Sequence, residues 1–427
     1  MKPFHLSLSV LAGLLLSVSV GCGSRPAADD AGEIEFWTMQ LQPKFNDYFN
    51  DLIAEFETEN PGVTVRWIDV PWSAMESKIL TAVSAKTAPD VVNLNPVFAS
   101  QLATRNVWAD LDTQISPEAR SQYLPNIWQA SILNDKSFGI PWYLTTQIVI
   151  YNRSLLQEAG LDKSPSTYIE LADMAKRVKE TTGKYGFFVS FVPEDSGEIL
   201  ESLIKMGVRL LDEEGKAAFN TPEGKAAFQY WVNLYQNELL PPEVLTQGHR
   251  YAIELYQAGE TALLTTGAQF FPTIENNAPD IATVSDIGLQ ITGETGKKNV
   301  AVMNLVIPRE TDKPEDALKF ALFVTNSANQ LAFAKEANVL PSTHDSVQKY
   351  IRELNDKTEP SPLDRASKVG AQQLNEAEVL LPAMDNLKAL QKAIYSNLQA
   401  AMLGEKSVDR ALEDAAKEWN ALASRNQ

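Results

Sequence analysis

The order of strand and helix patterns near the N-terminus is the feature that most constrains the fold. Glu33–Trp37 alternates like a short strand, and apolar residues then recur at helical spacing over residues 45–56. Val63–Val70 is rich in β-branched residues, a helical pattern covers Ser73–Ala85, and Asp90–Asn95 predicts another strand. This alternation predicts the opening of a doubly wound α/β sheet.

The carboxyl ends of these predicted strands carry aromatic and amide side chains. They are the segments Trp37–Gln42, Pro71–Trp72 and Asn95–Pro96. Ligands of doubly wound sheets bind beyond the carboxyl ends of the strands. We therefore expect these segments to contribute to one binding site.

The chain is long enough for two lobes with separate cores. It has 427 residues, whereas a single hydrophobic core stops growing near about 250–300 residues. Strand patterns return at Thr261–Thr266, Ile287–Ile291 and Val300–Ile307, and helical patterns fill the middle and the C-terminal part of the chain. No long low-complexity linker divides the chain into independent domains.

The first 24 residues differ in kind from the rest. Lys2 is followed by an uncharged stretch over Pro3–Ser24. Its dense apolar part, from Val10 to Val18, is too short to span a bilayer comfortably and is typical of a secretory signal. Cys22, the only cysteine, stands among small residues where such a signal is cut. The arrangement resembles a bacterial lipoprotein signal, which implies a signal peptide over residues 1–21, lipidation of Cys22 and a flexible tether over residues 22–33. Cleavage with release of the chain is the alternative.

The charge and the histidine content disfavour several classes of protein. The formal net charge is −18, from 37 basic and 55 acidic residues, and so acidic a surface repels phosphate backbones, which argues against nucleic-acid binding. His5 lies in the signal, and His249 and His344 are isolated, so neither a metal site nor a serine triad is supported. We expect no metal and no cofactor.

Several short motifs follow one another in a characteristic order. They are Asn60–Val65 (NPGVTV), Ala88–Val92 (APDVV), Gly139–Trp142 (GIPW), Tyr151–Asn152, Ala159–Asp162 (AGLD), Pro165, Thr167–Leu171 (TYIEL), Tyr256–Leu263 with Gly267, and Leu403–Leu412. Together they resemble the extracellular solute-binding proteins of carbohydrate importers, the maltose-binding-protein-like family. Asn299–Asn304 lacks the paired glycines that members of this family often carry there.

The resemblance implies an α/β, two-lobed periplasmic-binding-protein fold (class II-like), in which each lobe is a sheet flanked by helices and the ligand cleft lies between the lobes. We expect residues 34–143 plus 299–345 to form the N-terminal lobe and residues 144–298 plus 346–427 the C-terminal lobe. The implied function is capture of a sugar-like small molecule for an ATP-driven (ABC) importer by hinge closure, without catalysis. We expect a monomer that meets membrane permease subunits, in the periplasm or on the outer face of the cytoplasmic membrane.

A sugar site needs flat aromatic platforms and fixed hydrogen-bonding groups, because sugars present apolar C–H faces and a rim of hydroxyls. The candidate platforms are Trp37, Trp72, Trp142, Tyr143 and Phe270. The candidate polar partners are Gln40, Gln42, Asn95, Gln269 and Asn304, with Gly267 in the turn before Gln269. The other tryptophans are expected in cores or at lobe surfaces: Trp67, Trp108, Trp128, Trp231 and Trp419.

Two other functions stay open at this point. A surface glycoside hydrolase would need two carboxyl groups about 5–9.5 Å apart, but the acidic pairs Glu194–Asp195 and Glu213–Glu214 are expected on solvated loops. A glycerophosphate-type anion or a compatible solute would use the same scaffold, and an anion would require arginine or a helix N-terminus at the cleft. The strand-end segments contain no arginine, which favours a neutral polyol or a di- to trisaccharide.

Overall fold

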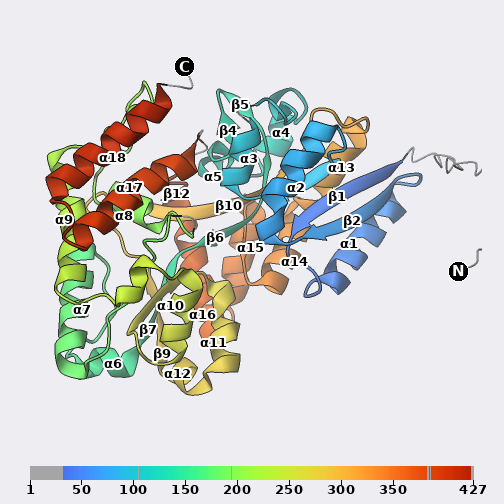
Figure 1. The fold of residues 1–427 in the computed structure, drawn as a ribbon. Helices are drawn as coiled ribbons and strands as arrows, with labels where there is room; N and C mark the ends of the chain where they lie inside the picture. Colours follow the sequence, from blue (N-terminus) through green and yellow to red (C-terminus); the bar gives the residue numbers. More distant parts are fainter. Residues whose placement is uncertain (1–31, 104, 194, 382–383, 385, 425–427) are drawn as a thin grey trace, which may run out of the picture.

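The structure is a computed structural model, and it describes residues 32–424 except residues 104, 194, 382–383 and 385. The chain folds into two lobes, drawn in Figure 1 with the N-terminal lobe on the right and the C-terminal lobe on the left. The predicted two-lobed α/β fold is confirmed. Cys22 and nearly all of the predicted tether lie outside the described residues.

The N-terminal lobe is built on one large sheet whose strands lie in the order β11-β6-β10-β3-β1-β2, with β12 paired to β10. The strands are β1 (Glu33–Met39), β2 (Thr64–Val70), β3 (Val91–Leu94), β6 (Ile140–Thr146), β10 (Lys298–Val306), β11 (Leu340–Pro341) and β12 (Ala377–Glu378). Strand β1 runs parallel to β2 and β3, whereas β10 runs antiparallel to β3 and β6. The parallel part is the doubly wound opening that the sequence predicts.

Two layers of helices cover this sheet because successive residues of a strand point to opposite faces. Phe36 of β1 packs on one face against Phe49 of α1 (Asn46–Glu59) and Phe320 of α13 (Pro314–Val324), with ring centres 6.2 and 5.2 Å away. Its neighbour Trp37 faces Lys78 of α2 (Trp72–Ala85) on the other side. The lobe also contains α3 (Pro96–Ala103), α4 (Pro117–Arg120), α5 (Pro125–Gln129), α14 (Ser327–Ala337), α15 (His344–Asn355) and the hairpin β4 (Ile132–Leu133) and β5 (Lys136–Ser137).

The C-terminal lobe has a smaller sheet and more helix. Strand β7 (Ile148–Asn152) lies between β8 (Leu263–Thr266) and β9 (Ser285–Leu289) and runs antiparallel to both. Its helices are α6 (Arg153–Glu158), α7 (Tyr168–Thr182), α8 (Glu198–Lys205), α9 (Pro222–Gln236), α10 (His249–Gln257), α11 (Phe271–Asn277), α12 (Pro279–Val284), α17 (Leu387–Met402) and α18 (Val408–Ala423).

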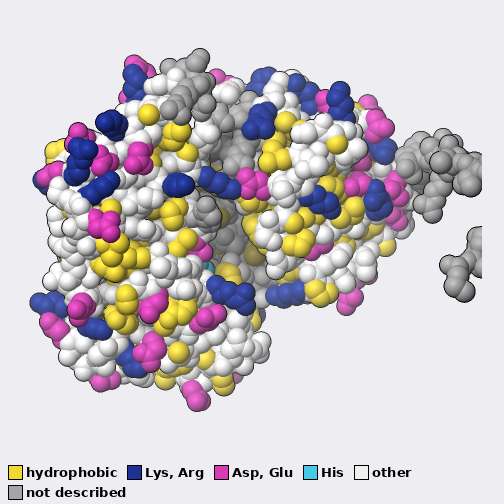
Figure 2. Space-filling model, in the orientation of Figure 1, with side chains coloured by type: hydrophobic (Ala, Val, Ile, Leu, Met, Phe, Trp, Pro, Cys, Tyr) yellow, Lys and Arg dark blue, Asp and Glu magenta, His cyan; other side chains and the backbone are white. Residues whose placement is uncertain are grey.

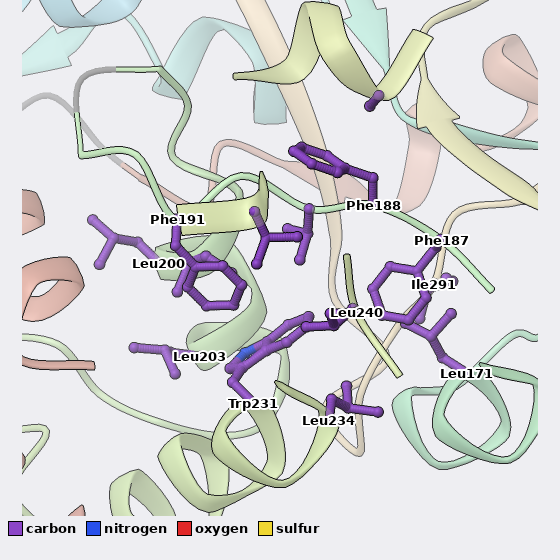
Figure 3. Close-up of a cluster of buried hydrophobic side chains, with 14 of the residues drawn as sticks. Leu171, Phe187, Phe188, Phe191, Leu200, Leu203, Trp231, Leu234, Leu240 and Ile291 are labelled. Atoms are coloured by element: carbon purple, nitrogen blue, oxygen red, sulfur yellow. The ribbon is translucent and has the colours of Figure 1, made fainter. Parts of the chain in front are cut away.

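The core of the C-terminal lobe is centred on Trp231, which Figure 3 shows among the side chains of Phe187, Phe191 and Leu203. Its indole Nε1 donates a hydrogen bond to Ser202 Oγ at 3.0 Å, so the one polar atom of the ring is satisfied. The prediction of core or surface packing is confirmed for the four tryptophans that are buried, which are Trp108, Trp128, Trp231 and Trp419. Trp67 is half-buried and packs against Phe49.

Two connections and one helix of the described chain lie between the lobes. Gln147 joins β6 to β7, and residues 290–297 join β9 to β10. Helix α16 (Pro362–Gln372) contacts β7 and β9 of one lobe and β6 and β11 of the other. The predicted lobe boundaries stay predictions about which segments move together; strand β6 continues in the N-terminal sheet through Thr146, and α15 packs on α14 and β11.

Within the described residues, every helix is too short or too polar to cross a bilayer.

Candidate functional site

The ends of strands from both lobes meet at the groove between the lobes, which is visible as a hollow in Figure 2. Strand β10 begins at Lys298 beside a crossing, and its Asn304 pairs with Leu94 at the end of β3, so the carboxyl end of β3 points toward the crossing. Strands β1 and β2 run in the same direction. In the other lobe, Ile148 follows the crossing and pairs with Thr266, the last residue of β8. The predicted strand-end segments therefore lie at the interlobe ends of their sheets.

Gln40, Gln42 and Trp72 come together where β1 ends and α2 begins. Asp69 of β2 fixes this loop, because its carboxylate accepts hydrogen bonds from the backbone N–H groups of Leu41 (2.9 Å) and Gln42 (3.1 Å). Gln40 has a left-handed backbone (φ 55°), and its Oε1 accepts a hydrogen bond from the backbone N–H of Trp72 at 3.5 Å. Both glutamine side chains are exposed, and Trp72 is 42% exposed. An exposed indole beside two amides has the chemistry that a sugar requires.

Asn95 follows β3 and is half-buried. Its Oδ1 accepts a hydrogen bond from the backbone N–H of Phe98 at 2.9 Å, which caps the start of α3. The side chain therefore has a structural role whether or not its amide nitrogen also meets a ligand.

Trp37 lies inside the N-terminal lobe and is 5% exposed. Its indole Nε1 donates to Glu35 Oε1, and the ammonium of Lys78 lies 4.1 Å from its ring centre. These contacts explain the position of the Trp37 side chain without a ligand.

Trp142 and Tyr143 of β6 lie in the aromatic core of the same lobe. Trp142 has no exposed surface and stacks on Phe333 with ring centres 4.9 Å apart. Tyr143 is 9% exposed, and burial raises the pKa of its phenol, as does the nearby carboxylate of Asp69. The sequence placed both at a ligand cleft, whereas in this structure both rings pack in the core of the lobe, and the indole Nε1 of Trp142 is buried without a hydrogen-bond partner.

Asn304 is also enclosed in the N-terminal lobe, with no exposed surface. Its Oδ1 accepts a hydrogen bond from Ser131 Oγ at 2.5 Å, and its backbone carbonyl accepts one from Asn93 Nδ2 at 3.3 Å. The residue sits at a register shift between β10 and β6, next to Met303. Its side chain is therefore directed into the lobe interior.

The turn after β8 lies at the interlobe end of the C-terminal sheet, because Thr266 pairs with Ile148 beside the crossing. Gln269 and Phe270 belong to a 3₁₀ turn, η3 (Ala268–Phe270), and both are half-buried. A side chain at Gly267 would meet Gln269 Oε1 at 2.1 Å, so the folded-back glutamine requires glycine there. The ring of His249 lies edge-on to Phe270 with ring centres 6.0 Å apart.

His249 lies beside the same turn, although its sequence neighbours gave no sign of this. Its Nε2 lies 3.3 Å from Thr266 Oγ1, and its backbone N–H donates to Asp195 Oδ2 at 2.9 Å. Burial lowers the pKa of the imidazole, and the carboxylate of Asp195 opposes that shift. The ring is therefore held neutral over more of the acidic range than a free histidine.

An ion pair crosses between the lobes. Lys388 Nζ of α17 lies 2.5 Å from Glu76 Oε2 of α2, and the same ammonium lies 5.6 Å from the ring centre of Phe98. The two partners are 312 residues apart in sequence, so only the tertiary fold reveals the pair.

Buried amides tie the two crossings together. Gln373 Nε2 donates to the carbonyl of Gln147 at 3.1 Å, and Gln373 Oε1 accepts from the backbone N–H of Gln290 at 3.1 Å. Gln290 Oε1 in turn accepts from the N–H of Asn299 at 2.7 Å. Gln290 and Gln373 are each 1% exposed. We refer to Gln147, Gln290, Gln373 and Asn299 as the crossing amides.

A charged face of α8 adjoins these amides. Gln147 accepts from Lys205 Nζ at 3.3 Å through Oε1 and donates to Glu201 Oε2 at 3.5 Å through Nε2. Burial raises the pKa of Glu198 to about 8 and raises the pKa of Glu201, while it lowers the pKa of Lys205. A cavity of about 30 Å³ lies beside Glu198, Lys205 and Trp231, which is room for about one water molecule.

Across the described parts of the chain, no group of three or more His, Cys, Asp or Glu side chains is placed to hold a metal ion.

Comparison with known proteins places this geometry among solute-binding proteins. The family of bacterial extracellular solute-binding proteins matches residues 42–331. A structure from Synechococcus sp. MITs9220, provisionally named an oligosaccharide periplasmic-binding protein, is 45% identical, has a TM-score of 0.87, and the match covers 92% of this chain and 99% of that one.

Two more distant relatives were matched, one by structure and one by sequence. The cyclic α-maltosyl-1,6-maltose binding protein of Arthrobacter globiformis is 22% identical with a TM-score of 0.79, over 92% of this chain and 99% of that one. The diacetylchitobiose binding protein DasA of Streptomyces coelicolor is 23% identical over 80% of this chain and 82% of its own length.

Proposed function

This chain belongs to the family of bacterial extracellular solute-binding proteins, and from that premise we propose that it captures a neutral oligosaccharide or related polyol between its lobes for an ATP-driven importer. The sugar class is supported by the names of its relatives, one provisional for oligosaccharides and two for maltose- and chitobiose-type sugars.

The observation that supports the proposal is that the sheet of each lobe ends toward the other lobe in an aromatic ring and an amide. Gln40, Gln42 and Trp72 stand at the interlobe end of one sheet, and Gln269 and Phe270 stand at the interlobe end of the other. This combination suits a ligand with apolar faces and a hydroxyl rim. We propose these side chains as the ligand contacts, with Asn95 and Gly267 supporting them.

Closure is proposed to be a hinge motion about the crossing amides. Gln373 hydrogen-bonds to Gln147 of one crossing and to Gln290 of the other, which supports a rotation of the lobes in this neighbourhood. A ligand shifts such an equilibrium only through tighter binding to the closed state, and contacts from both lobes provide that difference. Permease subunits of the importer would bind the closed conformation.

A neutral ligand fits the proposed contacts better than an anion does. The five proposed contact residues carry no charge, and the cation that crosses the groove, Lys388, is already paired with Glu76. A glycerophosphate-type ligand would need an arginine or another free donor cluster among the contacts. We therefore consider an anionic ligand less favoured than a neutral one.

Glycoside hydrolysis is the remaining competitor, and α8 holds the carboxyl groups that bear on it. Glu198, with its raised pKa, resembles the general acid of such enzymes, and Glu201 lies one helical turn away. The cavity beside Glu198 has only about 30 Å³, which cannot admit a sugar ring. The acidic pair Glu213–Glu214 is solvated, with side chains 94% and 72% exposed. We propose binding without turnover.

We also propose that Cys22 carries a lipid and that the mature protein is a monomer at the outer face of the cytoplasmic membrane. Radioactive palmitate labelling of cells that express the wild type and the Cys22→Ser variant tests the anchor. The label should be lost in the variant, and equal labelling of both would refute the assignment.

The function is tested by a thermal-shift screen of the purified protein against neutral oligosaccharides, polyols and glycerophosphates, with parallel chromatography of the sugars. A ligand that binds only the folded state raises the melting temperature. We expect at least one neutral oligosaccharide to do so while the sugar is recovered intact. Stabilisation by glycerophosphates alone would favour the anion, and appearance of shorter sugars would show a hydrolase.

A further inference from the structure

A second pocket, of about 290 Å³, lies on the N-terminal lobe at the end of the sheet away from the groove. Strand β10 runs from the crossing to Val306, and the pocket is lined by the residues just beyond it, Pro308 to Glu310. The C-terminal end of α2 and the segment after α3 complete the lining. This pocket takes no part in the proposed sugar site.

Three cations from separate segments line this pocket. They are Lys86 at the end of α2, Arg105 after α3 and Arg309 after β10. All three are exposed, and within the described chain none of their side chains has an ion-pair or hydrogen-bond partner. Glu310 is the one acidic residue of the lining, so the three cations outnumber it.

This concentration of positive charge is unusual in so acidic a protein. The chain carries a formal net charge of −18, and most of its cations are drawn into ion pairs with neighbouring acids. Lys86 and Arg105 follow helix C-termini, where a cation also stabilises the helix dipole. Arg309 follows a strand, so the dipole does not explain its place.

We propose that Lys86, Arg105 and Arg309 form a binding site for a phosphate group. Two guanidinium groups can each bind a phosphate through paired N–H donors, and the lysine adds a point charge. A concave pocket holds such a ligand better than an isolated surface cation does. Asn106, which also lines the pocket, offers a further exposed donor.

The site lies at the end of the lobe where the first strand begins. Lys313, three residues after Glu310, donates through Nζ to the backbone carbonyl of Glu33 at 2.7 Å. The segment that carries Cys22 joins the fold at this end. The phosphate can therefore belong to a phospholipid headgroup or to a soluble phosphate compound, and the experiment separates these sources.

The test compares three forms of the purified protein. The first is the wild type, and the second carries Lys86→Gln, Arg105→Gln and Arg309→Gln. The third is a control in which three exposed lysines elsewhere, without partners in the described chain, are changed: Lys349→Gln, Lys392→Gln and Lys417→Gln. Both triple variants lose the same charge and, being changed only at exposed positions, should melt like the wild type. One arm titrates inorganic phosphate by phosphorus NMR, and the other floats the protein with vesicles of phosphatidylglycerol or of phosphatidylcholine.

We expect at least a tenfold weaker phosphate-group interaction in the pocket variant than in the control, and salt should weaken it further. Loss in the vesicle arm alone, with phosphatidylglycerol, identifies a lipid headgroup; loss in the titration alone identifies a soluble phosphate. Equal behaviour of the pocket variant and the control in both arms would overturn the proposal. Glu310→Gln should strengthen the interaction several-fold, because it removes the one opposing charge from the lining.

Discussion

The two lobes present different chemistry to the groove that separates them. The N-terminal lobe offers neutral groups, Gln40, Gln42 and Trp72, on a loop held by Asp69 at the end of a large sheet. The C-terminal lobe places ionisable groups near the crossing: Glu198, Glu201, Lys205 and His249, each with a pKa displaced by burial. The contact residues of the N-terminal lobe therefore have no ionisable side chains, whereas the buried ionisable groups of the C-terminal lobe couple the stability of that lobe to pH.

The largest effect on stability is expected for a substitution in the aromatic core of the N-terminal lobe. Trp142→Ala removes a side chain with no exposed surface from between Phe333, Phe36 and Phe49. We expect the free energy of unfolding in urea to fall by about 3–5 kcal/mol. The milder Trp142→Phe should leave the sugar affinity of the folded protein unchanged. A loss of affinity in Trp142→Phe at normal stability would instead return this residue to the ligand site.

Trp72→Ala tests the proposed ligand contacts of the N-terminal lobe. Because Trp72 is 42% exposed, its loss should hardly alter the melting temperature, while the sugar affinity measured by calorimetry should fall about tenfold, or ~1.4 kcal/mol. Leu422→Ala is the matched control, since Leu422 is 38% exposed on α18. If both variants bind equally well, Trp72 is not a platform.

The ionisable groups of the C-terminal lobe are tested through Glu198, whose pKa is raised to about 8. The folded state holds a proton on this carboxyl that the unfolded state releases near pH 4.5. The stabilisation of the folded state by this bound proton is therefore fully present below about pH 4.5 and is lost as the pH rises through 8. Glu198→Gln should reduce the fall in unfolding free energy between pH 5.5 and 8.5 by roughly 1–2 kcal/mol.

The measurement for Glu198 is urea unfolding at both pH values. Glu118→Gln, at an exposed position of the N-terminal lobe, serves as control and should keep the wild-type pH slope. An unchanged slope in Glu198→Gln would mean that this carboxyl does not titrate in the window.

The smallest effect is expected where the two lobes touch. The Lys388–Glu76 ion pair has side chains 49% and 31% exposed, and such pairs contribute about 0–1 kcal/mol. Lys388→Met should open the unliganded protein slightly, seen as a larger radius of gyration in solution scattering, and the difference from wild type should shrink at high salt. A more compact variant would contradict a bridging role.

Part of the site could be read from sequence because it depends on local patterns. The positions of β1, β2 and β3 follow from local residue patterns, and the carboxyl end of each strand follows from its direction. Gln40, Gln42 and Trp72 were therefore found at the interlobe end of the sheet. Trp142 and Asn304 lay on strands too, but which face of a strand is enclosed depends on helices that arrive from elsewhere, here α14 for Trp142.

The sequence by itself determined the strand and helix order, the positions where strands end, and the motifs that mark the family, because each depends on residues close together in the chain. The tertiary structure alone decided that Lys388 meets Glu76, that Gln147, Gln290 and Gln373 share hydrogen bonds, and that α8 buries its carboxyl groups. These contacts join residues dozens to hundreds of positions apart, and burial and charge coupling act through space rather than along the chain.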